Sequence, residues 1–351
     1  MILVDGNKLN DIYYNGYYAQ ALYLGSTLLW QKKNKSPEKE LEDKFKEKGI
    51  STNSVSSGLK SIDDMYYDKE NNRFLVSSKK SGSSKGGISI IDEKSLSKKK
   101  ITSRQVSTVC YGNGKIIGGN GKDIFIFDKY GNVISEKYYS FSGNINKIRF
   151  YNGKFIACMT KGCVYTSTNG TTWSKKTTNT TVDLVDIAYG NGRYIIVGKT
   201  KNTLIYSDDD GQTWTEKHYT YQSTKDGFLS VDYSSVNNVF LLCRTTYNKS
   251  NPRTTYIVDK DTLAIKYSSK FTDVDRDYIG TYSTRTNGYL TFAPAHYSVD
   301  WYKLNCSYDL GKTYDEANII SNSNVHVIES CFGTSRILFG CSHGYLRYSN
   351  V

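Results

Sequence analysis

Residues 207–214 read SDDDGQTW and contain the chain's only run of three acidic residues, which suggests metal binding or acid catalysis. An EF-hand calcium loop carries acids at its first, third and fifth positions, glycine at the sixth and an acid at the twelfth. When Gly211 takes the sixth position, Tyr206 falls at the first and Lys217 at the twelfth, so this spacing fails. Glycoside hydrolysis needs two carboxyl groups that converge on one sugar bond, which neighbouring acids on one turn cannot do. The acidic run is therefore predicted to be structural.

The three aspartates of this run are expected to differ in orientation. The side chain of Asp209 can accept backbone N–H groups across a turn, and Gly211 can adopt the positive φ that closes the turn. Asp208 and Asp210 are expected to face solvent, where a loosely bound surface cation is the alternative.

The stretch from residue 278 to residue 305 is rich in side chains that suit ligand binding. Aromatic faces stack on sugar rings, while arginine, aspartate and histidine orient hydroxyl or acidic groups. The predicted ligand-binding residues are Tyr282, Arg285, Tyr289, His296, Tyr297, Asp300 and Trp301. The alternative is that these tyrosines fill space between sheets. A second candidate is the insertion formed by residues 225–230 and 245–256, because long loops often carry binding residues.

The remaining reactive side chains form no recognisable catalytic or metal-binding pattern. His218, His296, His326 and His343 are not clustered, and the sequence has no glycine-rich phosphate loop or GxSxG elbow. The seven cysteines are odd in number and scattered, which favours buried free thiols over disulfides or a zinc site. We therefore expect no metal and no cofactor.

These side chains must be positioned by strands, because the sequence repeats a strand–turn–strand unit. The stretches CYGNGKIIGG, FYNGKFIACM and AYGNGRYIIVG share an Asn-Gly turn and then a basic residue, Lys115, Lys154 or Arg193, at intervals of 39 residues. Weaker copies place Arg73, Val239, Tyr289 and Arg336 at the same point, which makes seven hairpins at steps of 42, 39, 39, 46, 50 and 47. A period near 40 with several short strands is typical of four-stranded β-propeller blades.

The predicted fold is all-β: a seven-bladed β-propeller with a small N-terminal β-module and a short linker helix. Six blades are the alternative, if the fifth repeat is split or misphased. The last repeat has room for about three strands. A closed ring therefore needs an outer strand from elsewhere, and the segment 59–62 is the expected donor.

Three segments in phase with these hairpins share a frame of Ser or Thr, Asp or Thr, Gly, and an aromatic residue; they start at residues 166, 207 and 307. The frame resembles the Asp box, or BNR repeat, S-x-D-x-G-x-T-W, of the sialidase-like β-propellers. The resemblance implies turns that join the two outer strands of a blade, away from the ligand face. The residues given structural roles by it are Thr166, Thr168, Gly170, Trp173, Ser207, Asp209, Gly211, Thr213, Trp214, Ser307, Asp309, Gly311, Thr313 and Tyr314.

The resemblance to sialidases does not extend to their catalytic residues. Sialidases hold the substrate with three arginines, and the first usually lies in an Arg-Ile-Pro segment. The three prolines of this chain, at positions 37, 252 and 294, do not follow such a pair. We therefore expect no enzymatic activity, with a glycan-cleaving, sialidase-like hydrolase as the remaining alternative.

The first 58 residues have a different organisation. Asp5-Gly6, Asn15-Gly16 and Gly25-Ser26 each separate two strand-like runs, which predicts a small meander of hairpins. In the stretch NKSPEKELEDKFKEKG, Ser36 suits a helix N-cap and Gly49 a helix end. The predicted units are an N-terminal β-hairpin docking module at 1–33, a helix and Ser-rich linker at 34–58, and the β-propeller at 59–351.

Two short motifs near the N-terminus, IYYNG at 12–16 and YLGSTLLW at 23–30, resemble the start of tail and baseplate proteins of Gram-positive phages and phage-tail-like bacteriocins (tailocins). The resemblance covers barely a tenth of the chain. It implies a virion component in which the N-terminal module docks to other tail or baseplate proteins. The propeller is then expected to bind a host-surface ligand, a glycan or an anionic wall polymer. The alternative is a purely structural baseplate or tail-fibre protein that binds other tail proteins.

Charge and hydropathy add to this expectation. The formal net charge of +12 favours anionic polymers as ligands, although we do not expect nucleic acid to be the partner. The sequence has no apolar run long enough to span a membrane and no signal peptide at its start. We therefore expect synthesis in the bacterial cytoplasm, no membrane insertion, and assembly into a tail or a tail-like particle.

Overall fold

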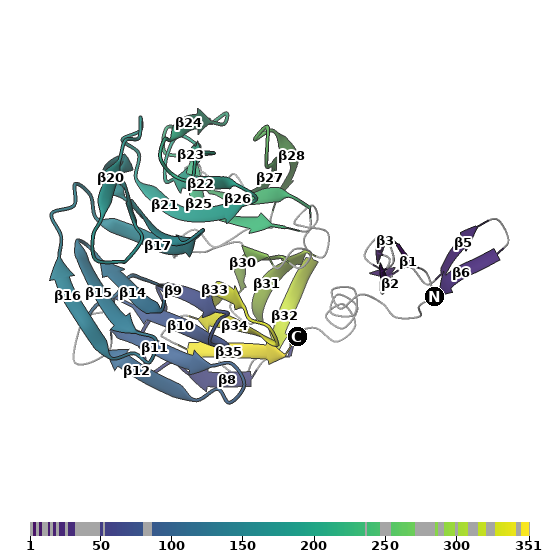
Figure 1. Cartoon of the computed structure of the whole chain (residues 1–351), viewed down its shortest axis with the longest axis horizontal. Coiled ribbons are helices and arrows are strands. Elements are labelled where there is room, and N and C mark those ends of the chain that lie inside the picture. Colours follow the sequence, from purple (N-terminus) through teal and green to yellow (C-terminus); the bar gives the residue numbers. More distant parts are fainter. Residues whose placement is uncertain are drawn as a thin grey trace. The chain divides into compact units, whose positions relative to one another are not determined.

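The computed structural model describes residues 53–79, 86–235, 237–245, 254–270, 327–341 and 345–350, and individual strands in the rest of the chain. The chain forms two compact units, Met1–Ile50 and Ser51–Val351. The second unit consists of β-sheets whose first strands contact one another in a ring (Figure 1). This ring is the β-propeller that the hairpin repeat predicts.

Five of the propeller's sheets are each built from four antiparallel strands that are consecutive in the chain. They are β9 (Asp64–Asp68), β10 (Arg73–Ser78), β11 (Gly87–Asp92) and β12 (Lys98–Thr102); β13 (Thr108–Gly112), β14 (Lys115–Asn120), β15 (Asp123–Asp128) and β16 (Val133–Tyr138); β17 (Ile145–Tyr151), β18 (Lys154–Met159), β19 (Val164–Ser167) and β20 (Ser174–Lys176); β21 (Leu184–Gly190), β22 (Arg193–Gly198), β23 (Thr203–Ser207) and β24 (Thr215–His218); β25 (Gly227–Ser234), β26 (Val239–Thr245), β27 (Thr254–Asp259) and β28 (Ile265–Lys270). We number these blades one to five in chain order.

A further four-stranded blade closes the ring with a strand from the other end of the propeller. It contains β33 (Val327–Phe332), β34 (Arg336–Cys341), β35 (Tyr345–Asn350) and β8 (Asn53–Ser56). Tyr345 pairs with Ser56 and Tyr348 with Asn53. The expected donor, 59–62, is wrong by a few residues: Leu59 and Ile62 are instead buried in the core beside this blade.

The prediction of a seven-bladed propeller is also wrong. Six four-stranded blades are found, and the remaining sheet departs from the pattern because it has five strands. Its strands are β29 (Arg285–Thr286), β30 (Thr291–Ser298), β31 (Trp301–Ser307), β32 (Asp315–Ile320) and β7 (Ile50–Ser51). The irregular sheet falls in the sixth repeat, where the hairpin spacing widens to 50 and 47 residues, rather than in the fifth.

The tight turns follow from their sequences. Asn113, Asn152 and Asn191 have positive φ angles, as do the glycines that follow them, Gly114, Gly153 and Gly192. Two consecutive positive φ angles define the type I′ turn, which asparagine and glycine adopt at low cost. Each Asn-Gly pair therefore specifies where the first strand of its blade ends and the second begins.

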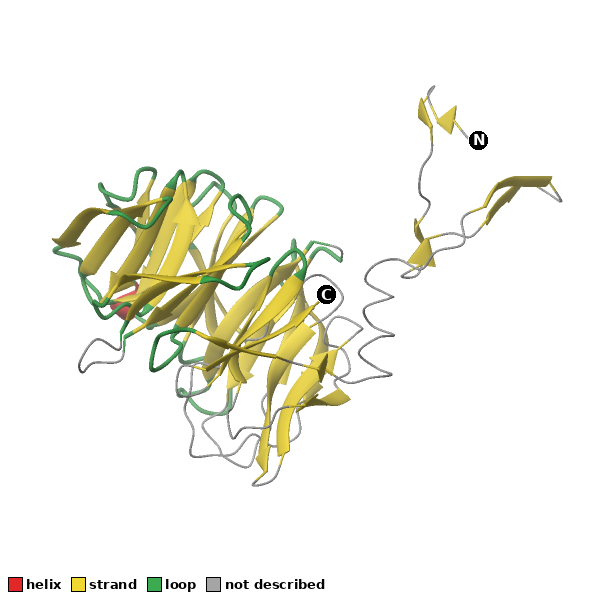
Figure 2. Ribbon diagram, turned by 90° about the horizontal axis from the view of Figure 1, so that it is seen from below, coloured by secondary structure: helices red, strands yellow, loops and turns green. Residues whose placement is uncertain are grey.

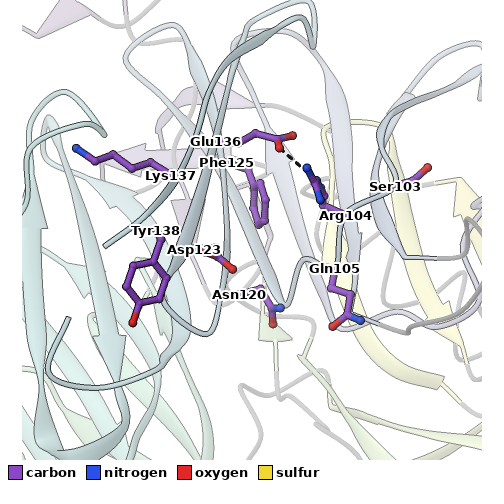
Figure 3. A pocket seen from close by; sticks show the side chains of 9 residues that line it. All are labelled: Ser103, Arg104, Gln105, Asn120, Asp123, Phe125, Glu136, Lys137 and Tyr138. Carbon is purple, nitrogen blue, oxygen red and sulfur yellow. Dashed lines mark hydrogen bonds and ion pairs between the residues drawn. The ribbon is translucent and has the colours of Figure 1, made fainter. Parts of the chain in front are cut away.

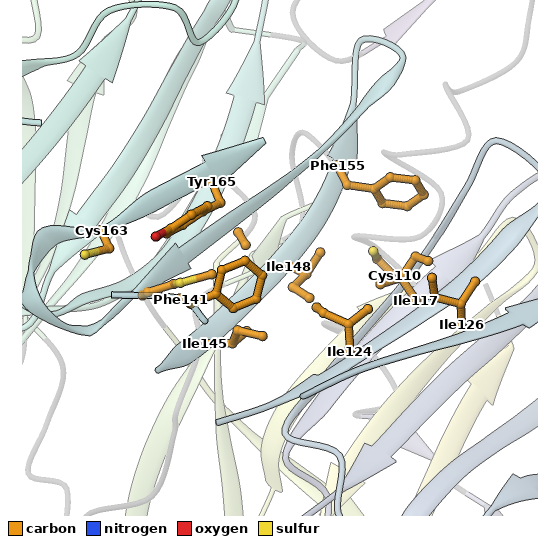
Figure 4. Close-up of a cluster of buried hydrophobic side chains, with 12 residues drawn as sticks. Cys110, Ile117, Ile124, Ile126, Phe141, Ile145, Ile148, Phe155, Cys163 and Tyr165 are labelled. Atoms are coloured by element: carbon orange, nitrogen blue, oxygen red, sulfur yellow. The ribbon is translucent and has the colours of Figure 1, made fainter. Parts of the chain in front are cut away.

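The core between the blades forms from the alternate residues of neighbouring sheets. One cluster joins blades two and three and includes Ile117, Ile124, Ile148 and Phe155, all fully buried (Figure 4). Cys110 and Cys163 pack in the same cluster as free thiols, and burial raises the pKa of Cys110 well above its usual range. These two cysteines therefore act as small apolar side chains.

Helical structure is minor within the described residues. The 3-10 turn η1 (Thr160–Gly162) is the helical element that Figure 2 draws in red. The sequence predicts a helix between Ser36 and Gly49, within the linker unit 34–58. These residues lie outside the described part of the chain. Within the described part of the chain, no helix is both long enough and apolar enough to cross a bilayer.

The N-terminal unit contains three separate two-stranded sheets rather than one meander. They are β1 (Leu3–Val4) with β2 (Asn7–Lys8), β3 (Tyr13–Tyr14) with β4 (Tyr17–Tyr18), and β5 (Ala21–Leu24) with β6 (Thr27–Gln31). Each hairpin turns at the dipeptide that the sequence indicates, because Val4 pairs with Asn7, Tyr14 with Tyr17, and Leu24 with Thr27.

Candidate functional site

A cavity of about 190 Å³ opens among the innermost strands of the propeller. Five strands from different blades supply its walls: β9, β17, β21, β25 and β33. Its lining residues are Met65, Tyr66, Tyr67, Arg149, Tyr151, Asp186, Ile187, Val231, Asp232, Ser330, Cys331 and Phe332. We call it the axial cavity. It combines aromatic faces with one cation and two carboxylates, the mixture that fixes small polar ligands.

The cation of the axial cavity is held by a buried ion pair. Asp64 is fully buried, and its two carboxylate oxygens accept from Arg149 Nη2 at 2.7 Å and Arg149 Nη1 at 2.8 Å. Lys147 Nζ donates to the same carboxylate at 2.9 Å. Thr108 Oγ1 and the backbone N–H of Val109 also donate to it, at 2.7 and 3.0 Å. These four donor residues all come from blades two and three, whereas Asp64 belongs to blade one, so the site exists only when the blades are assembled.

This surrounding sets the charge states. Burial alone would raise the pKa of Asp64, but the neighbouring charges of Arg149 and Lys147 lower it well below its usual range. The same carboxylate raises the pKa of Arg149, against the effect of burial. Asp64 therefore stays ionised and Arg149 stays charged at any physiological pH.

Arg149 keeps an unused hydrogen-bonding edge. Its Nη1 donates to Asp64 and to the carbonyl oxygens of Val109 and Ile148, and its Nη2 donates to Asp64. Within the described chain, the Nε–H and the second Nη2–H meet no acceptor. These two hydrogens lie on one edge of the planar guanidinium, and such an edge can bind a ligand oxygen at both points.

The other polar groups of the axial cavity are acceptors and phenols. Asp186 is 2% exposed and accepts from the backbone N–H of Val231 at 3.1 Å, whereas Asp232 is half-buried. The guanidinium carbon of Arg149 lies 5.8 Å from the ring centre of Tyr66, and burial raises the pKa of that phenol. Tyr66 is therefore neutral and presents both a ring face and a hydroxyl group.

The acidic run SDDDGQTW lies apart from this cavity, in the loop between β23 and β24, the two outer strands of blade four. Asp209 Oδ1 accepts the backbone N–H groups of Gln212 and Thr213 at 3.0 and 2.9 Å. Ser207 Oγ accepts from the N–H of Gly211, whose φ is 80°. Hydrogen bonds from Thr213 hold the pKa of Asp209 well below its usual range. The side chain of Asp209 thus closes the loop, and Trp214 is buried beneath it.

Asp208 and Asp210 reach solvent as expected, with 53% and 45% of their side chains exposed, but each of them also forms an ion pair. Asp208 receives two hydrogen bonds of 2.6 Å from Arg193. Asp210 accepts from Asn152 and from Lys154, both of the preceding blade, at 2.8 and 2.5 Å. Both aspartates are therefore committed to structural ion pairs.

In the loop of blade three, the structure shifts the roles by one residue. Ser167 Oγ accepts from the N–H of Gly170 at 2.8 Å, and Asn169 Oδ1 accepts from the N–H groups of Thr171 and Thr172. The roles assigned to Thr166 and Thr168 therefore belong to Ser167 and Asn169. Trp173 donates from its indole to the carbonyl of Gly170 at 3.0 Å. In the third copy, Ser307 is buried at the end of β31, and Asp309, Gly311, Thr313 and Tyr314 lie outside the described residues.

A set of contacts between blades was missed by reasoning from the sequence. At five of the hairpins, the basic residue after the turn donates to the outer turn of the next blade, a contact that we call the inter-blade latch. The latches run from Arg73 to the carbonyl of Lys129, from Lys115 to that of Asn169, from Lys154 to Asp210, from Arg193 to the carbonyls of Lys260 and Asp261, and from Arg336 to that of Glu93. In the sequence, the sign of these contacts is the basic residue that recurs after the hairpin turns. A lysine or arginine exposed to solvent would give the same pattern.

Four of the seven predicted ligand-binding residues fall in strands of the irregular sheet. Arg285 lies in β29, His296 and Tyr297 in β30, and Trp301 in β31, where Ser298 pairs with Trp301 across the hairpin. Tyr282, Tyr289 and Asp300 lie outside the described residues. The insertion 245–256 lies mostly outside them too. None of these residues lines the axial cavity as described, so this site stays a prediction.

The comparisons with known proteins agree on the fold. Residues 134–263 match a family model described as the DUF6242 beta propeller domain. The solved structure of YCF48 from Cyanidioschyzon merolae has a TM-score of 0.60 and 11% identity, covering 85% of this chain and 98% of its own. A structure of YCF48 bound to D1 peptide has a TM-score of 0.62 and 10% identity, covering 86% and 97%. The Cps50 (Swd1) beta-propeller domain from Myceliophteria thermophila has a TM-score of 0.59 and 12% identity, covering 86% and 99%. No curated protein sequence matches this chain.

These matches confirm the predicted β-propeller. At identities of 10–12%, the structural neighbours establish the fold alone. None of these matches is a sialidase-like or a tail protein, so both resemblances remain predictions from the sequence.

Proposed function

We propose that this chain is a binding protein whose axial cavity holds a hydroxyl-rich ligand, most simply one sugar unit of a glycan. The observation that carries the proposal is Arg149, which Asp64 holds rigidly while its Nε/Nη2 edge meets no acceptor among the described residues. A preorganised donor loses little conformational entropy on binding, so it contributes more affinity than a mobile arginine would.

The balance of charges favours a neutral polyol over an anion at this cavity. Lys147 and Arg149 are opposed by three carboxylates, those of Asp64, Asp186 and Asp232. A sugar hydroxyl can accept from Arg149 and donate to an aspartate, and the tyrosine rings can pack on the apolar face of a sugar. A volume of about 190 Å³ suits one ring rather than a drug-sized ligand.

We propose binding without cleavage. A glycosidase needs one carboxyl group as acid and a second as nucleophile or base. In the described part of the axial cavity, Asp186 already accepts from the backbone N–H of Val231 and supports the adjacent blade. A panel of fluorogenic glycosides tests this point. If the wild type hydrolyses a glycoside and Asp232→Asn does not, the chain is an enzyme and the proposal of binding without cleavage is wrong.

The setting that we propose is a phage tail or a tail-like particle, made in the bacterial cytoplasm. The support is the N-terminal sequence, IYYNG and YLGSTLLW, together with its three hairpins. In this setting the hairpin module docks to other tail or baseplate proteins and the propeller contacts the host surface.

The experiment is a glycan array that includes Gram-positive wall polymers, probed with the full chain and followed by calorimetry on the best ligand. We expect Tyr151→Phe and Asp232→Asn to weaken binding about tenfold, which equals about 1.4 kcal/mol. Asp123→Asn, outside the cavity, is the matched control. If both cavity variants bind the glycan as tightly as the wild type, the binding site lies outside the axial cavity. If the wild type binds no glycan, the proposal of a glycan ligand is wrong.

A second candidate is recognition of a partner protein, including a purely structural role in a baseplate. A propeller of similar fold has been solved with a peptide bound, namely YCF48 with D1 peptide. If the array is negative and the full chain captures a purified tail protein in a manner sensitive to Asp232→Asn, this candidate replaces the first.

A further inference from the structure

The outer strand of blade two, β16, exposes an unusual number of apolar side chains. Val133, Ile134 and Tyr138 are 59%, 51% and 64% exposed, and Tyr130 in the preceding turn is 63% exposed. Within the described residues, these four make up half of the exposed large hydrophobic side chains. An apolar patch on a strand at the edge of a sheet is a common sign of a docking surface.

A groove of about 570 Å³ runs beside this strand, toward blade one (Figure 3). Glu136, Lys137 and Tyr138 of β16 form part of its wall, together with Phe125 of β15. Arg104 approaches from the other side and pairs with Glu136 at 3.2 Å. Because 67% of the Arg104 side chain is exposed, this ion pair can rearrange at little cost when a ligand arrives.

The backbone of β16 is available on its outer side. The strand order of blade two is β13, β14, β15, β16, and within the described chain no further strand pairs with β16. The same protein shows that an outer blade edge accepts another strand, because β7 adds to β32 as the fifth strand of the irregular sheet. Strand addition at an open edge is an established mode of peptide recognition.

The charges around the groove indicate which kind of peptide segment it can bind. Lys99 lies on the neighbouring outer strand β12, and its Nζ donates to the carbonyl of Tyr130 at 2.8 Å. With Arg104 and Lys137, which line the groove, Lys99 beside it makes three cations against the two acids of the groove, Asp123 and Glu136. We propose that the edge of β16 binds an extended segment of a partner protein in which carboxylates alternate with apolar residues, as a fifth strand of blade two.

The test uses the full chain and two fluorescent octapeptides, one alternating Val and Glu and one alternating Val and Lys. We expect the acidic peptide to bind at least tenfold more tightly at low salt, since its charge complements the groove. A third peptide, the acidic one N-methylated at every residue, lacks backbone donors on both of its edges and should lose most of this affinity. Amide exchange should slow in β16 when the acidic peptide is bound.

The protein variants locate the site. Ile134→Glu should weaken binding of the acidic peptide at least tenfold, because the variant loses an apolar contact and places a carboxylate beside those of the peptide. Ile265→Glu, at an exposed position of the outer strand β28, should leave binding unchanged; Ile265 is 42% exposed and Ile134 is 51% exposed. Both sites are on the surface, and equal melting temperatures would show that both variants fold.

Three outcomes would overturn the proposal. The first is equal affinity for the acidic and basic peptides, and the second is an N-methylated peptide that binds as well as its parent. The third is self-association of the wild type that Ile134→Glu abolishes, since the occupant would then be a second copy of the chain.

Discussion

Lys154 Nζ lies 2.5 Å from Oδ2 of Asp210, although the two residues belong to neighbouring blades. Lys154 follows an Asn-Gly hairpin turn, and Asp210 belongs to the run of three acids that first suggests metal chemistry. Asn152 and Tyr194 also donate to Asp210, at 2.8 and 3.1 Å. Two sequence features that look like surface charge and catalytic acid thus form one structural contact between blades.

Removing the ammonium group of Lys154 tests the energetic value of this latch. We expect Lys154→Met, which keeps the apolar stem, to lower the free energy of unfolding by about 1 kcal/mol in urea titrations, because the ion pair is partly buried. Lys69→Met changes an exposed lysine outside any latch and is the control. Equal stability of the two variants would show that the latch contributes nothing.

The buried carboxylate of Asp64 should matter far more. Asp64→Asn leaves Lys147 and Arg149 buried without the carboxylate that accepts their hydrogen bonds, and we expect a loss of about 3–5 kcal/mol. Chemical unfolding measured against Asp123→Asn, a partly exposed aspartate, gives the comparison. A loss below about 1 kcal/mol would mean that the two cations find other partners or water.

The loop carboxylate of Asp209 should act on stability alone. Asp209→Ala removes the acceptor for the N–H groups of Gln212 and Thr213, so we expect a loss of about 1–2 kcal/mol. Affinity for any ligand should stay unchanged in the folded protein, which calorimetry can check. Lost affinity at unchanged stability would make this loop functional.

The pH dependence follows from the same carboxylate. The pKa of Asp209 is lower in the folded chain than the value of about 3.9 expected when unfolded, so the folded state binds fewer protons. Its contribution is therefore present above about pH 4 and is lost as the pH falls further. Asp209→Asn cannot titrate, so the stability difference between wild type and variant should shrink between about pH 4 and pH 2. A difference that stays constant across this range would contradict the assignment.

The local chemistry of the backbone determined much of this protein in advance. Asn113-Gly114, Asn152-Gly153 and Asn191-Gly192 specify hairpin turns because few other residue pairs adopt two positive φ angles. Their spacing near 40 residues was enough to predict a propeller. Periodicity, however, shows only where a unit recurs. It predicted seven blades, whereas six four-stranded blades are found among the described strands, because the sheet of β29–β32 recurs in the sequence but holds five strands.

Only the tertiary structure decided which side chains meet. Asp64 and Arg149 are separated by 85 positions, and neither belongs to a motif. The ring closes through β8 rather than through 59–62, because Leu59 and Ile62 gain more by burial than by pairing at an edge. In blade three, Ser167 and Asn169 take the roles that alignment gives to Thr166 and Thr168, because a turn selects the atoms within reach of its N–H groups. A turn can be predicted from neighbouring residues, whereas a site assembled from several blades depends on contacts that form when the ring closes.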